Sequence, residues 1–220
     1  MIKRGLLGTA QVPGGAKLEL YSHGADFMIV LERNELMSTR MRGSEEALAT
    51  MTIARLGRPA PHLLIGGYGM GFTLRAALAN LAADARITVA ELVPEIIDWA
   101  RGPMAGIASG CLDDPRVTLR QGDVADAIAK GRFEAILLDV DNGPDGLVRD
   151  ENDRLYSHSG LLAAKRALTA DGILAVWSAG PDKSFTRRLK EAGFTVEEIE
   201  VRARANGKGP RHTIWFGRKS

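Results

Sequence analysis

The sequence predicts an α/β fold with a mostly parallel, seven-stranded sheet that ends in an antiparallel C-terminal hairpin and is preceded by a small β meander. Beyond residue 61, short apolar runs alternate with segments in which apolar residues recur at helical spacing, as in repeated strand–helix units. The last two apolar runs follow each other without a helix, which is typical of a hairpin. Near the start of the chain, apolar runs are separated by turn residues alone, which indicates the meander.

The N-terminal part is expected to form this meander and one helix. The expected strands are 17–21, 27–31 and 36–41. The helix is expected to begin at Ser44, a candidate N-cap, and to end before Pro59. We therefore expect two units, the meander and helix over 1–58 and the α/β domain over 59–220.

The α/β domain is expected to consist of strand–helix units followed by the hairpin. The expected strands are 62–65, 86–92, 116–119, 135–138, 173–177, 195–201 and 213–216, and the expected helices are 74–81, 95–101, 161–168 and 183–192. Pro94 fits the first position of a helix, and Gly193 fits the residue that ends one. Such repeated units place helices on both faces of a parallel sheet.

The composition excludes several classes of protein. Hydrophobic residues make up 45% of the 220 residues and charged residues 25%, as in ordinary globular domains. The formal net charge of +2 is too small to indicate a nucleic-acid partner, and a single cysteine excludes an intramolecular disulfide. No apolar run approaches the roughly 18 residues of a membrane span, and the first residues do not resemble a signal peptide. We therefore expect a soluble, cytoplasmic protein without membrane contact.

A glycine-rich loop, Ile65-Gly-Gly-Tyr-Gly-Met-Gly71, connects the first parallel strand to its helix. Glycines let a ligand approach the backbone closely, and the start of the helix adds partial positive charge. The candidate cofactor-binding glycines are Gly66, Gly67, Gly69 and Gly71. Their spacing is tighter than the dinucleotide fingerprint Gly-x-Gly-x-x-Gly, and the absence of a Lys-Ser/Thr pair disfavours ATP or GTP. A tight turn without a ligand is the alternative interpretation.

Acidic residues follow three successive strands of the predicted sheet. Glu91 ends the second strand, 20 residues after Gly71, where a carboxylate can accept hydrogen bonds from both ribose hydroxyls. Asp123, followed by Val124, comes after the third strand, where it can accept from an adenine amino group, and Asp139 ends the fourth. Because the carboxyl ends of parallel strands meet at one edge, we expect these residues to share one crevice. For each acid alone, a helix N-cap or a solvated loop position is the alternative.

Five stretches together resemble the spermidine synthase (polyamine aminopropyltransferase) family, within the class I S-adenosylmethionine-dependent methyltransferase-like superfamily. They are residues 62–71, Glu91, 114–117, 122–123 and 139–144, and the resemblance extends over roughly 17–216. It implies a Rossmann-like, methyltransferase-type sheet and a homodimer. It also implies a cofactor, decarboxylated S-adenosylmethionine or S-adenosylmethionine, and transfer of an aminopropyl group to an amine such as putrescine.

The chain departs from that family at three places. Where the family's glycine loop carries an Asp that binds the aminopropyl amine, the loop of this chain offers the ring of Tyr68 or the thioether of Met70. The family's Tyr-His-Glu segment is matched only by Glu45. Its Asp-x-x-Asp-Pro motif becomes Asp139-Val-Asp-Asn-Gly-Pro144, which moves the second Asp to Asp141.

The expected catalytic residues are Asp139 and Asp141, because an amine nucleophile must lose a proton before it attacks and a neighbouring carboxylate can take that proton. We expect Glu45, Asp141 and Tyr156 to bind the substrate, with packing as the simpler alternative for Tyr156. Two alternatives to aminopropyl transfer remain open. One is methyl transfer from S-adenosylmethionine to an unknown acceptor, and the other is a non-catalytic binding protein that has kept the pocket.

Four histidines occur in the chain: His23, His62, His158 and His212. They lack the spacing of metal ligands, so we expect no metal and a turn or surface position for each. Met37 and Met41 are expected to be core residues that can also line the mouth of the cofactor site.

Overall fold

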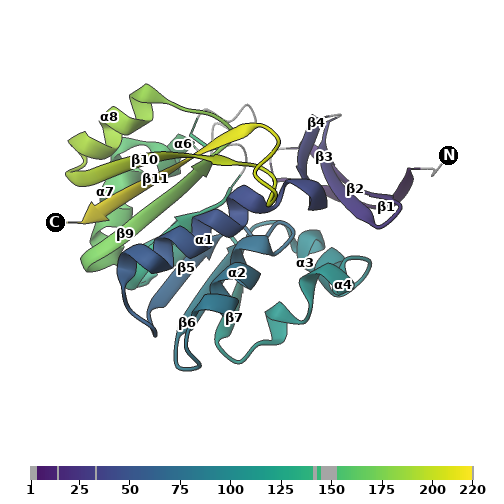
Figure 1. The fold of residues 1–220 in the computed structure, drawn as a ribbon, viewed down its shortest axis with the longest axis horizontal. Coiled ribbons are helices and arrows are strands. Elements are labelled where there is room, and N and C mark those ends of the chain that lie inside the picture. The colour runs from purple at the N-terminus through teal and green to yellow at the C-terminus, as the bar shows by residue number, and fades with distance from the viewer. Residues whose placement is uncertain (1–3, 14, 33, 141–142, 145–152, 220) are drawn as a thin grey trace.

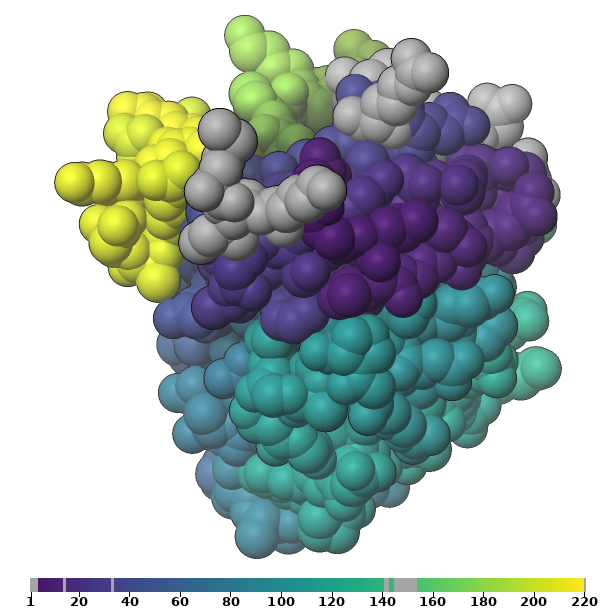
Figure 2. Space-filling model, turned by 90° about the vertical axis from the view of Figure 1, so that its right-hand side faces the viewer, coloured from purple at the N-terminus to yellow at the C-terminus, as the bar shows by residue number. Residues whose placement is uncertain are grey.

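The computed structural model describes residues 4–13, 15–32, 34–140, 143–144 and 153–219. These residues form a four-stranded sheet and a seven-stranded sheet, and the smaller sheet stands beside the larger one (Figure 1). Figure 2 shows the N-terminal strands, in purple, lying over the teal part of the chain. None of the helices in the described ranges combines the length and the apolar composition that a membrane crossing needs.

The smaller sheet is an antiparallel meander, as the sequence predicts. Its strands are β1 (Gly5–Gln11), β2 (Lys17–His23), β3 (Asp26–Leu31) and β4 (Asn34–Ser38), in that spatial order. The sequence does not predict β1, because its segment Gly-Leu-Leu-Gly-Thr-Ala-Gln has no clean alternation of apolar and polar residues. The last predicted strand ends early, at Ser38, and Thr39–Met41 form a 3₁₀ turn.

The larger sheet has the predicted topology. Its strands are β5 (His62–Gly66), β6 (Arg86–Glu91), β7 (Val117–Gln121), β8 (Phe133–Leu138), β9 (Leu168–Ser178), β10 (Phe194–Arg202) and β11 (Arg211–Lys219). The spatial order is β10-β11-β9-β8-β5-β6-β7. Strands β5 to β9 pair in parallel, and β11 and β10 add the antiparallel hairpin beside β9. The carboxyl ends of the parallel strands therefore lie along one edge of the sheet.

Helices cover both faces of the larger sheet. One face carries α1 (Gly43–Leu56), α2 (Phe72–Asn80) and α3 (Pro94–Arg101), and the other carries α5 (Val124–Lys130), α7 (His158–Ala167) and α8 (Lys183–Glu191). Short helices α4 (Ala105–Ala108) and α6 (Asp153–Tyr156) and the 3₁₀ turn Cys111–Asp113 complete the described part. Successive strand residues point to opposite faces, so Leu63 and Ile65 join the first core whereas Leu64 joins the second. The sequence misses α5, because its seven residues are too few to show a helical period.

Helix α1 connects the meander to the larger sheet. It packs beside α2 and against β9 and β10, and it begins at Gly43, one residue before the predicted N-cap. The Gly43 N–H donates to the Ala203 carbonyl, 2.7 Å away, in the loop between β10 and β11. Near the other end, Arg55 donates two hydrogen bonds of 2.8 and 2.9 Å to Glu197 of β10. The boundary between 58 and 59 remains a prediction, and α1 itself packs on the larger sheet.

We expect Gly43→Ala to destabilise the fold by roughly 1–3 kcal/mol. A Cβ atom at this position would lie 2.6 Å from backbone atoms of Arg204 and Ala205, so the hairpin would have to move. The matched control is Gly106→Ala in α4, where an added Cβ meets no atom within 4 Å. Chemical denaturation measures the free energy of unfolding of both variants, and equal values would contradict the close docking of α1.

Candidate active site

The glycine-rich loop runs from the end of β5 to the start of α2. Gly67, Gly69 and Gly71 have φ angles of +84°, +55° and +78°, a region that favours glycine. A Cβ atom at Gly67 would collide with the carbonyl oxygen of Asp139, and the Gly67 N–H donates to the Ala90 carbonyl at 2.9 Å. The loop is therefore held tightly between the ends of β8 and β6.

Glu91 ends β6 and holds the same loop through its side chain. Its carboxylate accepts hydrogen bonds from the Tyr68 N–H at 2.8 Å and from the Val93 N–H at 2.9 Å. Burial raises the pKa of Glu91, and the backbone N–H donors partly offset that effect. Glu91 also lines the cavity beside the loop, so its carboxylate can serve a ligand as well as the backbone.

Asp123 caps a helix and lines the same cavity. Its Oδ1 accepts from the Ala125 N–H at 2.8 Å, which is the N-cap role that the sequence leaves open. Its Oδ2 lies 3.6 Å from the Arg154 guanidinium. Val124, the next residue, lines the cavity beside it. The capping role therefore does not remove Asp123 from the candidate site.

The cavity beside the loop, which we call the glycine-loop cavity, encloses about 740 Å³, part of it open to solvent. Its polar groups come from the carboxyl edge of the larger sheet, and Leu18 and Leu31 of the smaller sheet close it from the other side. Ile96 of α3 and Leu155 of α6 add apolar surface. The cavity is therefore largely apolar, with carboxylates at one edge.

A second cavity, which we call the acidic cavity, adjoins the first. It encloses about 680 Å³, and three carboxylates line it, from Glu35 of β4, Glu45 of α1 and Asp139. The residues that line both cavities are Leu36, Met37, Gly69 and Asp139. Asp139 therefore stands where the two cavities meet.

Asp139 and Glu45 form a pair of perturbed carboxyl groups. The Thr73 hydroxyl donates to Oδ2 of Asp139 at 2.6 Å, but burial outweighs this bond and raises the pKa of Asp139 to about 6. Burial first, and then the charge of Asp139, raise the pKa of Glu45 well above its ordinary value. A cation placed between these groups would favour their charged forms. The acidic cavity thus suits a positively charged ligand.

The structure brings most of the predicted site residues to these two cavities. Gly67, Gly69, Glu91, Asp123, Val124 and Asp139 line the glycine-loop cavity, and Glu45 lines the acidic cavity. Gly66 and Gly71 instead allow close packing under the loop. A Cβ atom at Gly66 would lie 2.8 Å from Val124, and one at Gly71 would lie 2.7 Å from the Tyr68 hydroxyl. Asp141, the second predicted catalytic acid, and Asn142 lie outside the described residues.

Tyr156 does not line either cavity as far as the described residues define them. Its ring is buried in the second core and packs edge-on against Phe185, with the ring centroids 5.7 Å apart. Its hydroxyl donates to the Val140 carbonyl at 3.4 Å. This position fits the packing role that the sequence leaves open, rather than contact with a substrate.

Tyr68 does not occupy the place that the sequence analysis gives it. Its ring lies behind the loop, only 4% exposed, with its hydroxyl 3.4 Å from the Cys111 sulfur. The loop position between the two cavities is Gly69, where an added Cβ would lie 3.0 Å from the Met37 sulfur. The left-handed backbone at Gly67 and Gly69 turns the intervening side chain toward the core. A thioether from β4, and not the tyrosine ring, therefore lies at the junction.

His212 and Trp177 are site residues that the sequence analysis misses. His212 is expected at a turn or surface position, but it is 7% exposed on β11 and lines the acidic cavity beside Trp177 of β9. Because β11 runs antiparallel to β9, the first residues of β11 lie at the carboxyl edge, with Thr213 opposite Ser178. The register of the predicted hairpin is the signal that places His212 at this edge.

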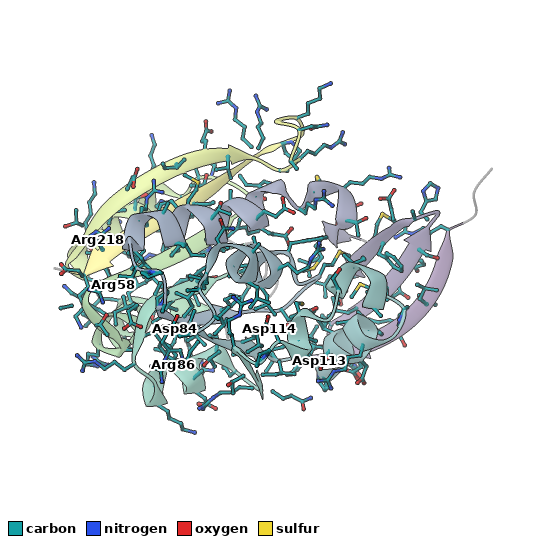
Figure 3. The ribbon with its side chains drawn as sticks, turned by 60° about the horizontal axis from the view of Figure 1, so that its bottom comes forward. Arg58, Asp84, Arg86, Asp113, Asp114 and Arg218 are labelled. Carbon is teal, nitrogen blue, oxygen red and sulfur yellow. The ribbon has the colours of Figure 1, made fainter. Side chains whose placement is uncertain are left out.

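The candidate site is confined to the carboxyl edge of the sheet. Arg58, Asp84 and Arg86 lie at the amino ends of β5 and β6 (Figure 3), and none of them lines either cavity. Within the described ranges, no group of three or more His, Cys, Asp or Glu side chains is placed to hold a metal ion.

Comparison with known proteins gives sequence relatives but no matching family model. A protein of Mycobacterium tuberculosis (strain ATCC 25618 / H37Rv), named polyamine aminopropyltransferase, is 29% identical over 153 residues. The match covers 64% of this chain but only 28% of that protein, so the chain spans much less than the length of this curated relative.

Solved structures share the fold over almost the whole chain. The spermidine synthase of Thermotoga maritima has a TM-score of 0.78 at 19% identity, with 98% of this chain and 73% of that chain covered. A spermidine synthase in complex with the transition-state analogue AdoDATO has a TM-score of 0.77 at 18% identity, with 98% and 72% covered. The resemblance stated from the sequence is thereby confirmed: the chain is similar in sequence to polyamine aminopropyltransferases and has the fold of the spermidine synthases.

Proposed function

We propose that the chain transfers an aminopropyl group from decarboxylated S-adenosylmethionine to a small amine such as putrescine. The observation that carries this proposal is the position of Asp139 between two cavities of different character. One cavity is largely apolar and lies beside a glycine loop, and the other is lined by three carboxylates. The names of the relatives, polyamine aminopropyltransferase and spermidine synthase, support the same reaction.

The residues of the glycine-loop cavity fit an adenosyl group. Glu91 presents a carboxylate that can accept from ribose hydroxyls, and Asp123 with Val124 can meet the edge of an adenine ring. The apolar side chains of Ile96 and Leu155 can cover the faces of the base. A sulfonium group bound there would activate its attached carbon toward attack and leave as a neutral thioether.

The acids of the acidic cavity would bind the amine and take its proton. Oδ2 of Asp139 is held by Thr73, whereas Oδ1 accepts no hydrogen bond from the described residues. The Glu45 carboxylate likewise forms no hydrogen bond or ion pair in the described part of the chain, although it lines the cavity. We assign Asp139 as a proton acceptor and Glu45 as a partner of the ammonium group. Asp141 remains a proposed second acid, and a cytoplasmic location belongs to the same proposal.

Methyl transfer from S-adenosylmethionine is a second candidate, and the junction of the cavities favours it. The position between the cavities is Gly69, which has no carboxylate, and the Met37 thioether lies against it. An ammonium group on the transferred chain would therefore find no carboxylate on the glycine loop. Leaving such a charge unpaired in a partly dry site costs several kcal/mol.

We also propose that the chain forms a homodimer through β1. This strand is an edge of the smaller sheet, and an unpaired edge can bind a strand of another chain. Leu6 and Leu7 on β1 are 52% and 44% exposed. Pairing of two β1 strands would cover both the edge and these side chains.

The first test of the reaction compares the two sulfonium donors in the presence of putrescine. With decarboxylated S-adenosylmethionine, we expect the wild-type protein to form methylthioadenosine, and Asp139→Asn to lower the rate by about 10²-fold or more. Asp98→Asn, at an exposed position on α3, is the control and should retain the rate. Formation of S-adenosylhomocysteine from S-adenosylmethionine as the only product would favour methyl transfer. If neither donor gives a product with any amine, the interpretation as a non-catalytic binding protein would be favoured.

A second test measures how much the charged form of Asp139 destabilises the folded state. Its pKa in the folded chain is raised from 3.8 to about 6, so the folded state binds more protons than the unfolded state in that interval. The free energy of unfolding therefore falls as the pH rises from about 4 to about 6. Above about pH 6, the charged form of Asp139 destabilises the fold by its full amount.

We expect Asp139→Asn to be more stable than the wild type at pH 8 by roughly 1–3 kcal/mol, with the difference shrinking toward pH 4. Urea denaturation at both pH values measures this, with Asp98→Asn again as the control. A destabilised Asp139→Asn at pH 8 would contradict the unfavourable burial of this carboxylate.

For the homodimer, light scattering at micromolar concentration should give twice the chain mass of 23.7 kDa. The double substitution Leu6→Lys and Leu7→Lys should shift the protein to the monomer, because two cationic side chains on each edge would repel. A wild-type protein that scatters only as a monomer would refute the dimer.

A further inference from the structure

His212 lies in the wall of the acidic cavity but has no part in the reaction proposed so far. It is the second residue of β11 and is 7% exposed, and it lines the same cavity as Asp139 and Glu45. Its ring packs edge-on against Trp177, with the centroids 4.8 Å apart and the planes at 81°. The imidazole is therefore fixed in place at the cavity that would hold the amine.

The two ring nitrogens of His212 have different surroundings. Nδ1 lies 2.8 Å from Oγ of Ser44, a fully buried residue on the first turn of α1 that does not line the cavity. Nε2 has no hydrogen-bond partner among the described residues. It is also absent from the fully enclosed polar atoms without a partner, so protein atoms do not cover it completely. Because His212 borders the acidic cavity and is otherwise buried, Nε2 is the nitrogen that opens toward this space.

Burial keeps this imidazole neutral. Burial lowers the pKa of His212 below 6.5, so the ring is uncharged at neutral pH. Acidic groups reach the cavity from three elements: Glu45 from α1, Glu35 from β4 and Asp139 from the end of β8. The facing residues of the neighbouring strands, Trp177 and Ser178 on β9 and Val201 on β10, carry no charge. None of the three acids is hydrogen-bonded to the ring in the described part of the chain.

We propose that His212 is a further catalytic residue: its Nε2, rather than the carboxylate of Asp139, takes the proton that the acceptor amine loses, and Asp139 stabilises the charge that forms. The hydrogen bond to Ser44 holds the ring in place. This inference rests on the proposed group transfer. This role requires the tautomer in which the Nδ1–H donates to Oγ of Ser44 and the lone pair of Nε2 faces the acidic cavity.

The proposed step conserves protons and electrons. The ammonium group gives one proton to Nε2, which forms an imidazolium. The freed lone pair on nitrogen then forms the new N–C bond as the C–S bond breaks, and the electron pair of that bond stays on sulfur. The carboxylates of Asp139 and Glu45, in the same cavity, stabilise the imidazolium until water takes its proton.

The first experiment compares His212→Asn with His158→Asn, an exposed control at the start of α7. Asn can keep a hydrogen bond to Ser44 but has no group at the place of Nε2. At pH 7 we expect kcat to fall by about 10²–10⁴-fold in His212→Asn, with a smaller change in KM, and to stay unchanged in the control. Ser44→Ala should lower kcat less than His212→Asn does, because this variant loses the hydrogen bond to Nδ1 but keeps the imidazole base.

The pH dependence separates a base from a packing residue. An alkyl amine deprotonates near pH 10, where it no longer needs a base. The ratio of the wild-type rate to the His212→Asn rate should therefore fall steadily between pH 7 and pH 10. A ratio that does not change with pH, or a variant as active as the wild type, would overturn the inference while the proposed function stands.

A second measurement does not depend on turnover. Nitrogen-15 NMR of the histidine rings in the wild-type protein reports the tautomer of each ring directly. We expect His212 to carry its proton on Nδ1, and its Nε2 signal to shift when putrescine is added, whereas His158 does not respond. If the protein shows no group transfer, the proposed function fails, and this shift still decides whether an amine meets Nε2. A proton on Nε2, or no shift, would overturn the role of His212.

Discussion

The site depends on a backbone contact between the ends of two neighbouring strands. The Asp139 N–H donates to the Gly66 carbonyl at 2.9 Å, and at Gly67 no side chain fits beside the Asp139 carbonyl. Glycine is therefore required where the loop of β5 passes the end of β8. This contact fixes the backbone of Asp139, and Thr73 then fixes one of its oxygens. Because Asp139 lines both cavities, this backbone contact also fixes the wall that the two cavities share.

The topology and the polar edge of the sheet can be predicted from sequence because both follow from periodic patterns. Alternating buried runs and helical repeats predict a mostly parallel sheet of seven strands, and acids at strand ends mark its carboxyl edge. The orientation of single side chains cannot be predicted in this way. Tyr68 turns away from the cavities because two left-handed glycines flank it, and His212 reaches them only through the antiparallel register of the last strand. Such features depend on the backbone angles and pairings of the folded chain. Asp141 lies outside the described residues, so its role remains a prediction.

The acidic cavity shows a conflict between stability and chemistry. Burial makes the charged forms of Asp139 and Glu45 unfavourable, and the charge of Asp139 further disfavours the charge on Glu45. The fold keeps them together because α1, which carries Glu45, is fastened to the C-terminal hairpin at both ends, through Gly43 and Arg55. Active sites commonly hold groups in arrangements that the rest of the fold must stabilise. A helix that is firmly docked can carry a carboxyl group into surroundings that a loose helix would avoid.

The wall shared by the two cavities has a consequence for how their occupants affect each other. Leu36, Met37, Gly69 and Asp139 belong to both, so a molecule in one cavity forms part of the surface that the other molecule meets. Thermodynamic linkage requires that any change which one of the proposed ligands makes in the affinity for the other is reciprocal. A single molecule that fills both spaces would lose its translational and rotational freedom only once, so joining the two proposed ligands covalently should give a compound that binds far more tightly than either part.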